Sequence, residues 1–192
     1  NVNQVNSAAD KAISFSDESK VADVDVLIDF TLPAGMRNHL KTALDKKLPM
    51  VIGTTGLTSE DMALLENAAK HIPIVFARNY SVGVNVLLNL VQTAATKFGD
   101  DLDIEVFEAH HRHKIDAPSG TALAIGESIA QAKGWDHDEV AVYDRSQVET
   151  AKSQNEIGYS VLRGGDIVGE HTAYFATMGE RLELTHKASS RM

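Results

Sequence analysis

The sequence predicts an α/β unit with a parallel sheet, followed by an α+β domain with a mixed β-sheet. In the first part of the chain, apolar strand-like runs alternate with helical stripes in the order strand, helix, strand, helix, strand. Short connections in this order favour parallel strands joined by right-handed crossovers. Further along, two helical patterns flank one strand and four strand-like runs follow in succession, an order that is typical of α+β domains. We place the domains at 1–80 and 81–190.

The parallel sheet is predicted from three short apolar runs at 24–30, 50–52 and 72–77. Between the first two, Pro33 suits the first turn of a helix. One face of that helix carries apolar residues at helical spacing, namely Met36, Leu40, Ala43 and Leu44. A second helix is predicted to begin after Thr58, because Thr58 and Asp61 have the spacing of a capping box.

The second domain is predicted to begin with a long helix over 84–95 that Gly99 ends, and with a strand over 102–106. A polar segment from Glu108 to Pro118 then leads into a helix whose apolar face carries Ala122, Ile125, Ile129 and Ala132. Four strands are expected at 140–143, 157–163, 166–176 and 181–187, with Met178-Gly179-Glu180 as the turn between the last two.

Composition excludes several classes of partner. The 192 residues carry a net charge of -9, and a field of that sign repels nucleic acid and anionic membranes. The sequence shows neither an apolar run long enough to span a bilayer nor a secretion signal. There is no cysteine, which excludes thiolate chemistry and suits a reducing cytoplasm. We therefore expect a cytoplasmic protein with no nucleic-acid or membrane partner.

The chemistry is expected in the segment from Glu108 to Thr121. It contains three of the eight histidines together with Arg112 and Lys114, and it concentrates positive charge in an acidic chain. Such a cluster captures an anion that the rest of the surface repels, and a carboxylate-bearing substrate is the natural candidate. The segment opens a helix, whose first N–H groups also bind anions.

Individual roles in this segment have alternatives. His110 and His111 are either solvent-exposed loop residues or proton donors, and the surrounding charge favours the second interpretation. Ser119 is either a plain N-cap or part of the anion site. Asp116 is expected to accept from a neighbouring N–H. Arg112 and His113 either maintain the local potential or pair with the carboxylates of Glu105 and Glu108. A metal site on the three histidines is disfavoured, because Arg112 and Lys114 would repel a dication.

Two further motifs follow predicted strand ends. Gly53-Thr54-Thr55-Gly56 stands after the second parallel strand and Asn79-Tyr80-Ser81 after the third. Open α/β sheets bind ligands at this edge. The alternatives are an ordinary strand-to-helix turn for the first motif and a domain linker for the second.

The sequence resembles the dihydrodipicolinate reductase family, the 4-hydroxy-tetrahydrodipicolinate reductases of bacterial diaminopimelate and lysine biosynthesis. The resemblance rests on the uninterrupted signature at 105–122, which reads EVFEAHHRHKIDAPSGTA. Further blocks occur in family order at 51–56, 79–85, 163–171 and 186–191. It covers nearly the whole chain and implies a Rossmann-like first domain and a homotetramer, with the strand-rich stretch 157–187 as the interface.

The resemblance implies NADPH- or NADH-dependent reduction of a small heterocyclic dicarboxylate, 4-hydroxy-tetrahydrodipicolinate, to tetrahydrodipicolinate. Carried over to this chain, the family pattern makes His110 the proton donor and Lys114 its partner acid. The substrate carboxylates would be bound by His111, Lys114, Gly120 and Thr121. The cofactor would be bound by Gly53, Thr54, Thr55, Ala77, Tyr80 and Arg191. No metal is implied.

The chain departs from the family pattern at its ends. Members begin with a strand and a glycine-rich dinucleotide loop, and they continue beyond the Lys-Ala-Ser-Ser-Arg block into elements that complete the nucleotide domain. In this chain only residues 191–192 begin the return to that domain. We therefore expect a chain truncated at both ends, with an incomplete Rossmann-like sheet. Two alternatives to the enzyme remain open, a non-catalytic dicarboxylate-binding and assembly module of the same family and a metal-dependent hydrolase.

Overall fold

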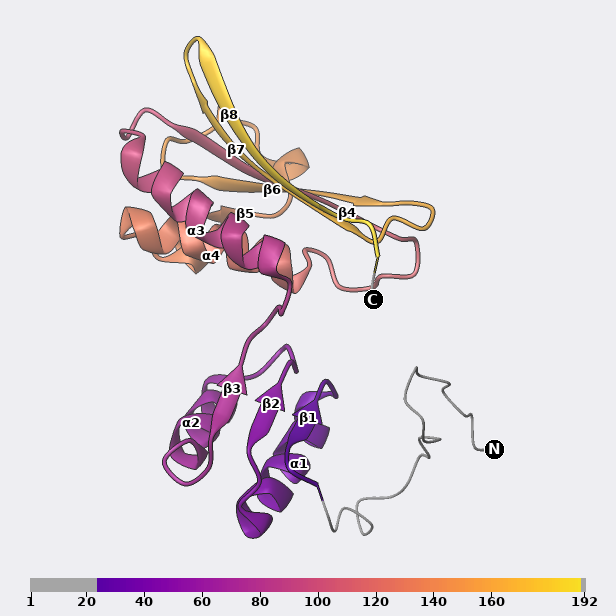
Figure 1. Cartoon of the computed structure of the whole chain (residues 1–192). Coiled ribbons are helices and arrows are strands. Elements are labelled where there is room, and N and C mark those ends of the chain that lie inside the picture. The colour runs from indigo at the N-terminus through magenta and orange to yellow at the C-terminus, as the bar shows by residue number, and fades with distance from the viewer. Residues whose placement is uncertain (1–23, 191–192) are drawn as a thin grey trace. The chain divides into compact units, whose positions relative to one another are not determined.

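The computed structural model describes residues 24–190, so Arg191, which is predicted to bind the cofactor, lies outside the described residues. The chain divides into two compact units, Asn1–Phe76 and Ala77–Met192, each of which is drawn in Figure 1. Within the described part of the chain, no helix is both long and apolar enough to cross a membrane. The predicted fold class is confirmed, because a parallel sheet is followed by a mixed sheet.

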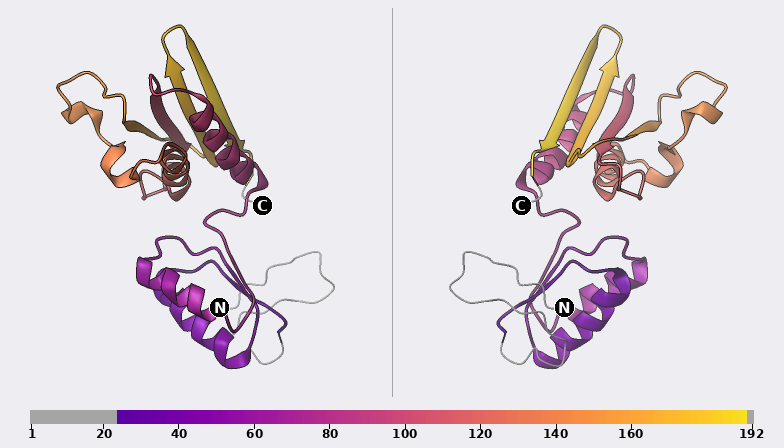
Figure 2. Two further views of the ribbon diagram at one scale, coloured as in Figure 1. Left: turned by 90° about the vertical axis from the view of Figure 1, so that its left-hand side faces the viewer. Right: turned by 90° about the vertical axis from the view of Figure 1, so that its right-hand side faces the viewer.

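The first unit is a three-stranded parallel sheet in the order β1-β2-β3. Its strands are β1 (Leu27–Asp29), β2 (Met50–Ile52) and β3 (Ile74–Phe76). The two connecting helices are α1 (Pro33–Lys46) and α2 (Ser59–Ala68), and both lie on one face of the sheet, as Figure 2 shows. Their apolar stripes pack on the strands, and the core between them consists of Met36, Leu40, Ala43, Met50, Ile52, Leu65, Ala68 and Ile72.

Local signals set the ends of these helices as predicted. Pro33 occupies the first turn of α1. At α2 the Thr58 side chain accepts from the Asp61 N–H and the Asp61 side chain accepts from the Thr58 N–H, which completes the capping box. The opposite face of the sheet remains open, with Ile28 65% and Val75 56% exposed.

The second unit is a five-stranded mixed sheet in the order β5-β6-β4-β7-β8. The strands are β4 (Asp103–His110), β5 (Ala141–Val142), β6 (Ile157–Arg163), β7 (Gly169–Thr177) and β8 (Glu180–Ala188). The central strand β4 is parallel to β6 and antiparallel to β7. The hairpin of β7 and β8 turns at Gly179, whose φ of 97° requires glycine, as the predicted turn implies.

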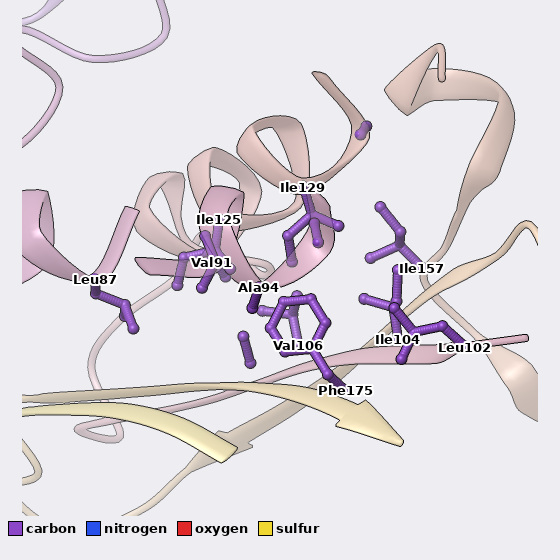
Figure 3. Packing of buried hydrophobic residues seen from close by; sticks show 14 of the residues in the cluster. Leu87, Val91, Ala94, Leu102, Ile104, Val106, Ile125, Ile129, Ile157 and Phe175 are labelled. Atoms are coloured by element: carbon purple, nitrogen blue, oxygen red, sulfur yellow. The ribbon is translucent and has the colours of Figure 1, made fainter. Parts of the chain in front are cut away.

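Two helices, α3 (Val82–Lys97) and α4 (Gly120–Lys133), cover one face of this sheet. They contribute Val91, Ile125 and Ile129 to a core in which the strands place Ile104, Val106, Ile157 and Phe175. Figure 3 shows these side chains pointing toward one another between the helices and the strands. This core holds β4 and the start of α4, which together carry the segment 108–121.

The structure corrects four element boundaries. Helix α3 runs from Val82 to Lys97, two residues longer at each end than the predicted 84–95, and it stops before Gly99 as expected; Phe98 leaves the helical region and its ring stacks on Phe175. Of the strand predicted at 140–143, Val140 instead ends the short helix α5 (His137–Val140), and Ala141–Val142 pair as β5. A 3₁₀ turn, η2 (Arg145–Gln147), follows. The strand expected from Asp166 begins at Gly169, because Gly165 adopts a positive φ in a turn.

The fourth correction bears on function. The segment from Glu108 was predicted to be a polar loop, but β4 continues through it to His110. Glu108 and His110 are buried on the face of β4 that also carries Ile104 and Val106, since alternate residues of a strand share a face. The strand therefore delivers a carboxylate and an imidazole to the end of the core.

Candidate active site

A row of polar side chains crosses three strands of the mixed sheet. The antiparallel register pairs Glu108 of β4 with His171 of β7 and His171 with His186 of β8. His110 stands two residues after Glu108, on the same face. Directly opposed strand residues have Cβ atoms about 5 Å apart, so the register alone brings one carboxylate and three imidazoles together.

The carboxylate of Glu108 is buried and anchored on one side. Its Oε1 accepts a hydrogen bond from the Ser119 N–H at 3.1 Å and another from Arg163 Nη2 at 2.7 Å. Burial alone would raise the pKa of Glu108, but these two donors and the Arg163 charge hold that pKa below its usual value. The group is therefore a carboxylate at neutral pH.

The other oxygen of Glu108 faces imidazoles. Oε2 lies 3.3 Å from His110 Nδ1 and 3.8 Å from His171 Nε2. Both Oε2 and His110 Nδ1 are buried, and within residues 24–190 neither has a hydrogen-bond partner. Burial lowers the pKa of His110, and the Glu108 charge opposes that shift while Lys114 and Arg163 add to it.

His171 is the more deeply buried imidazole. Its Nε2 lies 3.2 Å from Ser119 Oγ, and that hydroxyl also accepts from the Ala122 N–H as the N-cap of α4. Burial, with the nearby His110, lowers the pKa of His171 to about 4. His171 is therefore neutral at physiological pH and packs as a polar wall of the site. The N-cap interpretation of Ser119 is confirmed.

A cavity of about 750 Å³ opens next to this cluster. His110 and Thr121 line it, as do Tyr80 and two residues of the hairpin, His186 and Lys187. The described residues that line the cavity include histidine, lysine, serine and asparagine side chains but no carboxylate. In a chain with 27 acidic residues this composition suits an anionic ligand.

The loop after β4 holds the remaining predicted residues. Lys114 Nζ donates to both Asp116 oxygens at 2.8 Å, and the Asp116 carboxylate also accepts from its own backbone N–H, so Asp116 is an acceptor, as expected. His111 Nδ1 accepts from the His113 N–H at 3.2 Å. His111, Lys114 and Gly120 are not among the residues that line the cavity, although Thr121 directly follows Gly120.

The partners expected for Arg112 and His113 are otherwise engaged, which corrects that alternative. Glu105 pairs with Lys152, and Glu108 pairs with Arg163. Arg112 and His113 are exposed.

The two motifs at the strand ends lie in different units. In the first unit, Thr54 is buried and its hydroxyl donates to Asp29 Oδ1 at 2.7 Å, so this side chain orders the loop. Gly53 packs against Phe30, where an added Cβ would approach the ring to 2.1 Å. Thr55 is exposed after β2, at the edge where parallel sheets bind ligands.

The second motif belongs to the second unit. The Asn79 side chain donates to the Thr121 hydroxyl at 3.1 Å, and Tyr80 lines the cavity. Ala77 directly follows β3 in the chain, at the start of the second unit. Arg78 pairs with Glu127 and is exposed.

The geometry changes the metal question. Among the described residues, the group with metal-ligand geometry is Glu108, His110 and His171, whose ligand atoms lie within 4.8 Å of one another. It differs from the trio His110, His111 and His113 weighed from the sequence. The guanidinium of Arg163 is bonded to the same carboxylate, and a fixed cation there disfavours a dication. The absence of a metal stays a prediction.

Sequence reasoning considered Glu108 only as a possible partner of Arg112 or His113, and it assigned no role to Arg163, His171, His186 or Lys187. The signal was partly present, because the sequence predicts the strands that carry Arg163 and His171. The missing information was the register between strands, which a single sequence does not contain.

Comparison with known proteins gives consistent results. The family model described as "Dihydrodipicolinate reductase, N-terminus" matches residues 2–80, and the model described as "Dihydrodipicolinate reductase, C-terminus" matches residues 83–192. A protein of Pseudoalteromonas translucida named 4-hydroxy-tetrahydrodipicolinate reductase is 84% identical over the whole chain, which spans 72% of that protein. One of the same name from Pseudomonas fluorescens is 58% identical, over 94% of this chain and 67% of its own length.

A solved structure is also similar. It is a dipicolinate-bound dihydrodipicolinate reductase from Paenisporosarcina sp. TG-14, with a TM-score of 0.62 and 27% sequence identity. The match covers 87% of this chain and 63% of that protein.

The depressed pKa of His171 predicts a pH dependence of stability. The unfolded chain binds a proton near pH 6.5, whereas the folded chain binds it only near pH 4. Stability therefore rises with pH across that window, and the contribution is lost as pH falls. Between pH 7 and pH 5 the free energy of unfolding should fall by about 1–2 kcal/mol more in the wild type than in His171→Gln.

Denaturant titration followed by fluorescence of Trp135, the single tryptophan, measures this difference in the unit that holds His171. Equal pH dependence in the two proteins would contradict a neutral, buried His171.

Proposed function

The chain belongs to the dihydrodipicolinate reductase family, and we propose that it carries the substrate-binding and proton-transfer residues for reducing 4-hydroxy-tetrahydrodipicolinate to tetrahydrodipicolinate. The observation that carries the proposal is the position of His110, whose imidazole lies at the end of β4 and lines a carboxylate-free cavity. A dicarboxylate fits the charge of that cavity, and dipicolinate is what the Paenisporosarcina protein binds. We place the reaction in the cytoplasm.

The residues divide into roles by what their side chains can do. His110 donates the proton, because its imidazole is the titratable group that faces the cavity from the central strand. Thr121 binds a substrate carboxylate through its hydroxyl, which Asn79 already orients. Lys114 and His111, in the loop after β4, bind the substrate carboxylates. Gly120 leaves open space for the substrate at the start of α4, because nothing lies within 4 Å of an added Cβ there.

A reduced nicotinamide cofactor, NADPH or NADH, supplies the hydride when bound. We assign its binding to Gly53, Thr54, Thr55, Ala77, Tyr80 and Arg191. The loop after β2 fits this role, because it stands at the carboxyl end of a parallel strand. The hydrogen bond from Thr54 to Asp29 of the neighbouring strand β1 fixes the shape of this loop. The Thr54 hydroxyl is already used there, so Thr54 would contact the cofactor through its backbone.

We also propose a homotetramer that forms through the mixed sheet. Helices α3 and α4 cover one face of that sheet, while the opposite face presents Phe107, Leu162 and Tyr174. Leu162 is 41% exposed and the two aromatic residues are partly exposed. Analytical ultracentrifugation should find four copies, and a monomer at micromolar concentration would contradict the proposal.

The charge of the loop predicts opposite effects of two substitutions on dicarboxylate binding. Lys114→Ala should weaken binding of pyridine-2,6-dicarboxylate about tenfold or more, because it removes a charged donor. Asp116→Asn should strengthen binding roughly threefold, because it releases Lys114 from an exposed ion pair. Isothermal titration calorimetry on the chain measures both. Unchanged affinity in both variants would exclude Lys114 from the carboxylate site.

Turnover tests the reaction itself. This chain can replace the matching 72% of the Pseudoalteromonas protein to form a chimera, since the two are 84% identical there. In the chimera, His110→Gln should lower kcat by about 10²-fold or more with little change in KM, because the proton donor is lost. The loss of NADPH absorbance measures the rate, and His113→Gln in the exposed loop is the control.

Two outcomes would contradict the proposed reaction. Full activity of the His110→Gln chimera would remove His110 from the mechanism. An inactive wild-type chimera that still binds pyridine-2,6-dicarboxylate would favour the alternative, a non-catalytic dicarboxylate-binding and assembly module.

A further inference from the structure

We propose that Glu108 is a positioning residue that fixes the proton of His110 on Nδ1, so that Nε2 is the nitrogen that exchanges a proton with the substrate. The catalytic consequence rests on the proposed function. The tautomer itself does not, and it can be measured in the chain alone.

The first step in fixing this tautomer is the orientation of the carboxylate. Glu108 Oε1 is fixed by the Ser119 N–H at 3.1 Å and by Arg163 Nη2 at 2.7 Å. Ser119 caps α4, and Arg163 also donates to the backbone carbonyl of Asp116 at 2.7 Å. With Oε1 held by a helix start and by a neighbouring strand, Oε2 is left pointing at the imidazoles.

The second step is the pairing of two orphaned atoms. Glu108 Oε2 and His110 Nδ1 are both buried, lie 3.3 Å apart and lack any other partner in the described residues. An ionised carboxylate only accepts hydrogen bonds. The nitrogen that faces it must therefore carry hydrogen, and a small rotation of the His110 ring completes the bond. His171 Nε2 is farther from Oε2, at 3.8 Å, and lies closer to Ser119 Oγ.

The third step is the direction of the other ring nitrogen. A Cβ added at Gly169 would lie 3.1 Å from His110 Nε2, so the ring turns this edge toward Gly169, which lines the cavity with it. Glycine at 169 leaves the space in front of Nε2 open. One nitrogen of His110 thus faces a fixed carboxylate and the other faces the side from which a substrate would approach.

This arrangement defines the proton transfer. In the imidazolium form both nitrogens carry hydrogen. The Nε2–H bond breaks, its electron pair stays on Nε2, and the proton passes to the substrate. The product is the neutral Nδ1–H tautomer, which Glu108 already favours, so no rearrangement of the ring is needed before the next proton is taken up.

Charged and titratable groups from every neighbouring element surround His110. The charges that act on it are Glu108 on the same strand, Lys114 and Asp116 on the following loop and Arg163 on β6. The titratable neighbours are His171 on β7, which is neutral, and His186 on β8. Burial lowers the pKa of His110, and the negative charge of Glu108 is the largest opposing influence. Removing the Glu108 charge should lower the pKa of His110 further, so that the imidazolium loses its proton at a lower pH.

The substitution Glu108→Gln reverses the hydrogen-bond polarity. Arg163 and the Ser119 N–H both require an acceptor, so the amide oxygen takes the Oε1 position and the amide NH₂ takes the Oε2 position. A donor then faces His110 Nδ1, and the proton should move to Nε2. Nitrogen NMR of the ¹⁵N-histidine-labelled chain distinguishes protonated from unprotonated ring nitrogens and requires neither cofactor nor substrate.

We expect His110 to be the Nδ1–H tautomer in the wild type and the Nε2–H tautomer in Glu108→Gln. Glu105→Gln, the same change on the opposite face of the same strand, should leave the wild-type tautomer in place. Glu108→Asp, which keeps the charge, should keep Nδ1–H. An Nε2–H tautomer in the wild type would overturn the proposal even if Glu108→Gln failed to fold, and so would an unchanged tautomer in a folded Glu108→Gln.

In the chimera, Glu108→Gln should lower kcat by about 10²-fold, the lower end of what a positioned general acid contributes. The alkaline limb of the pH profile of kcat, on which the imidazolium form is lost, should move to lower pH, and Glu108→Asp should restore part of both. A lower kcat with an unshifted pH profile would mean a structural role only and would overturn the proposal. An inactive wild-type chimera would count against the proposed function, while the tautomer measurement would still decide the role of Glu108.

Discussion

The site depends on a buried carboxylate that is held on one side and open on the other. Glu108 is nearly inaccessible to solvent, and a buried charge persists only when it is paired and hydrogen-bonded. Arg163 supplies the charge and the start of α4 supplies the N–H. The same contacts tie three parts of the second unit to one point, because β4, β6 and α4 all meet at this carboxylate. The local order of the site and the ionisation of Glu108 therefore depend on the same contacts.

The parallel sheet of the first unit also contains a buried carboxylate that is held by hydrogen bonds. Asp29 ends β1 and accepts from the Thr31 N–H, the Thr31 hydroxyl and the Thr54 hydroxyl, all at Oδ1. These donors hold the pKa of Asp29 below its usual value against its burial. In both units a buried carboxylate near the end of a strand accepts hydrogen bonds from a nearby loop. These hydrogen bonds hold the loops that we assign to cofactor and substrate.

Much of the fold follows from local pattern. The β2 and β6 strands coincide with the predicted runs because each is a short apolar segment bounded by turn residues, and α2 begins where its capping box places it. The end of β4 could not be found in this way, because Glu108 and His110 are polar residues that a strand buries. The site was found only in part for the same reason. His110, Thr121 and Tyr80 line the cavity as sequence motifs suggested, whereas His186 and Lys187 reach it through the β7–β8 register.

The ionisation of Glu108 is the most direct test of this account. Carbon NMR of the chain labelled at the glutamate carboxyl carbon follows that group through a pH titration, with the Glu108→Gln spectrum assigning the signal. We predict that the Glu108 carboxyl stays ionised until the pH falls below the usual glutamate pKa, and that it does not titrate between pH 5 and pH 8. A Glu108 signal that titrates above the usual glutamate value would mean a protonated, neutral group facing His110, and the arrangement described for the site would be wrong.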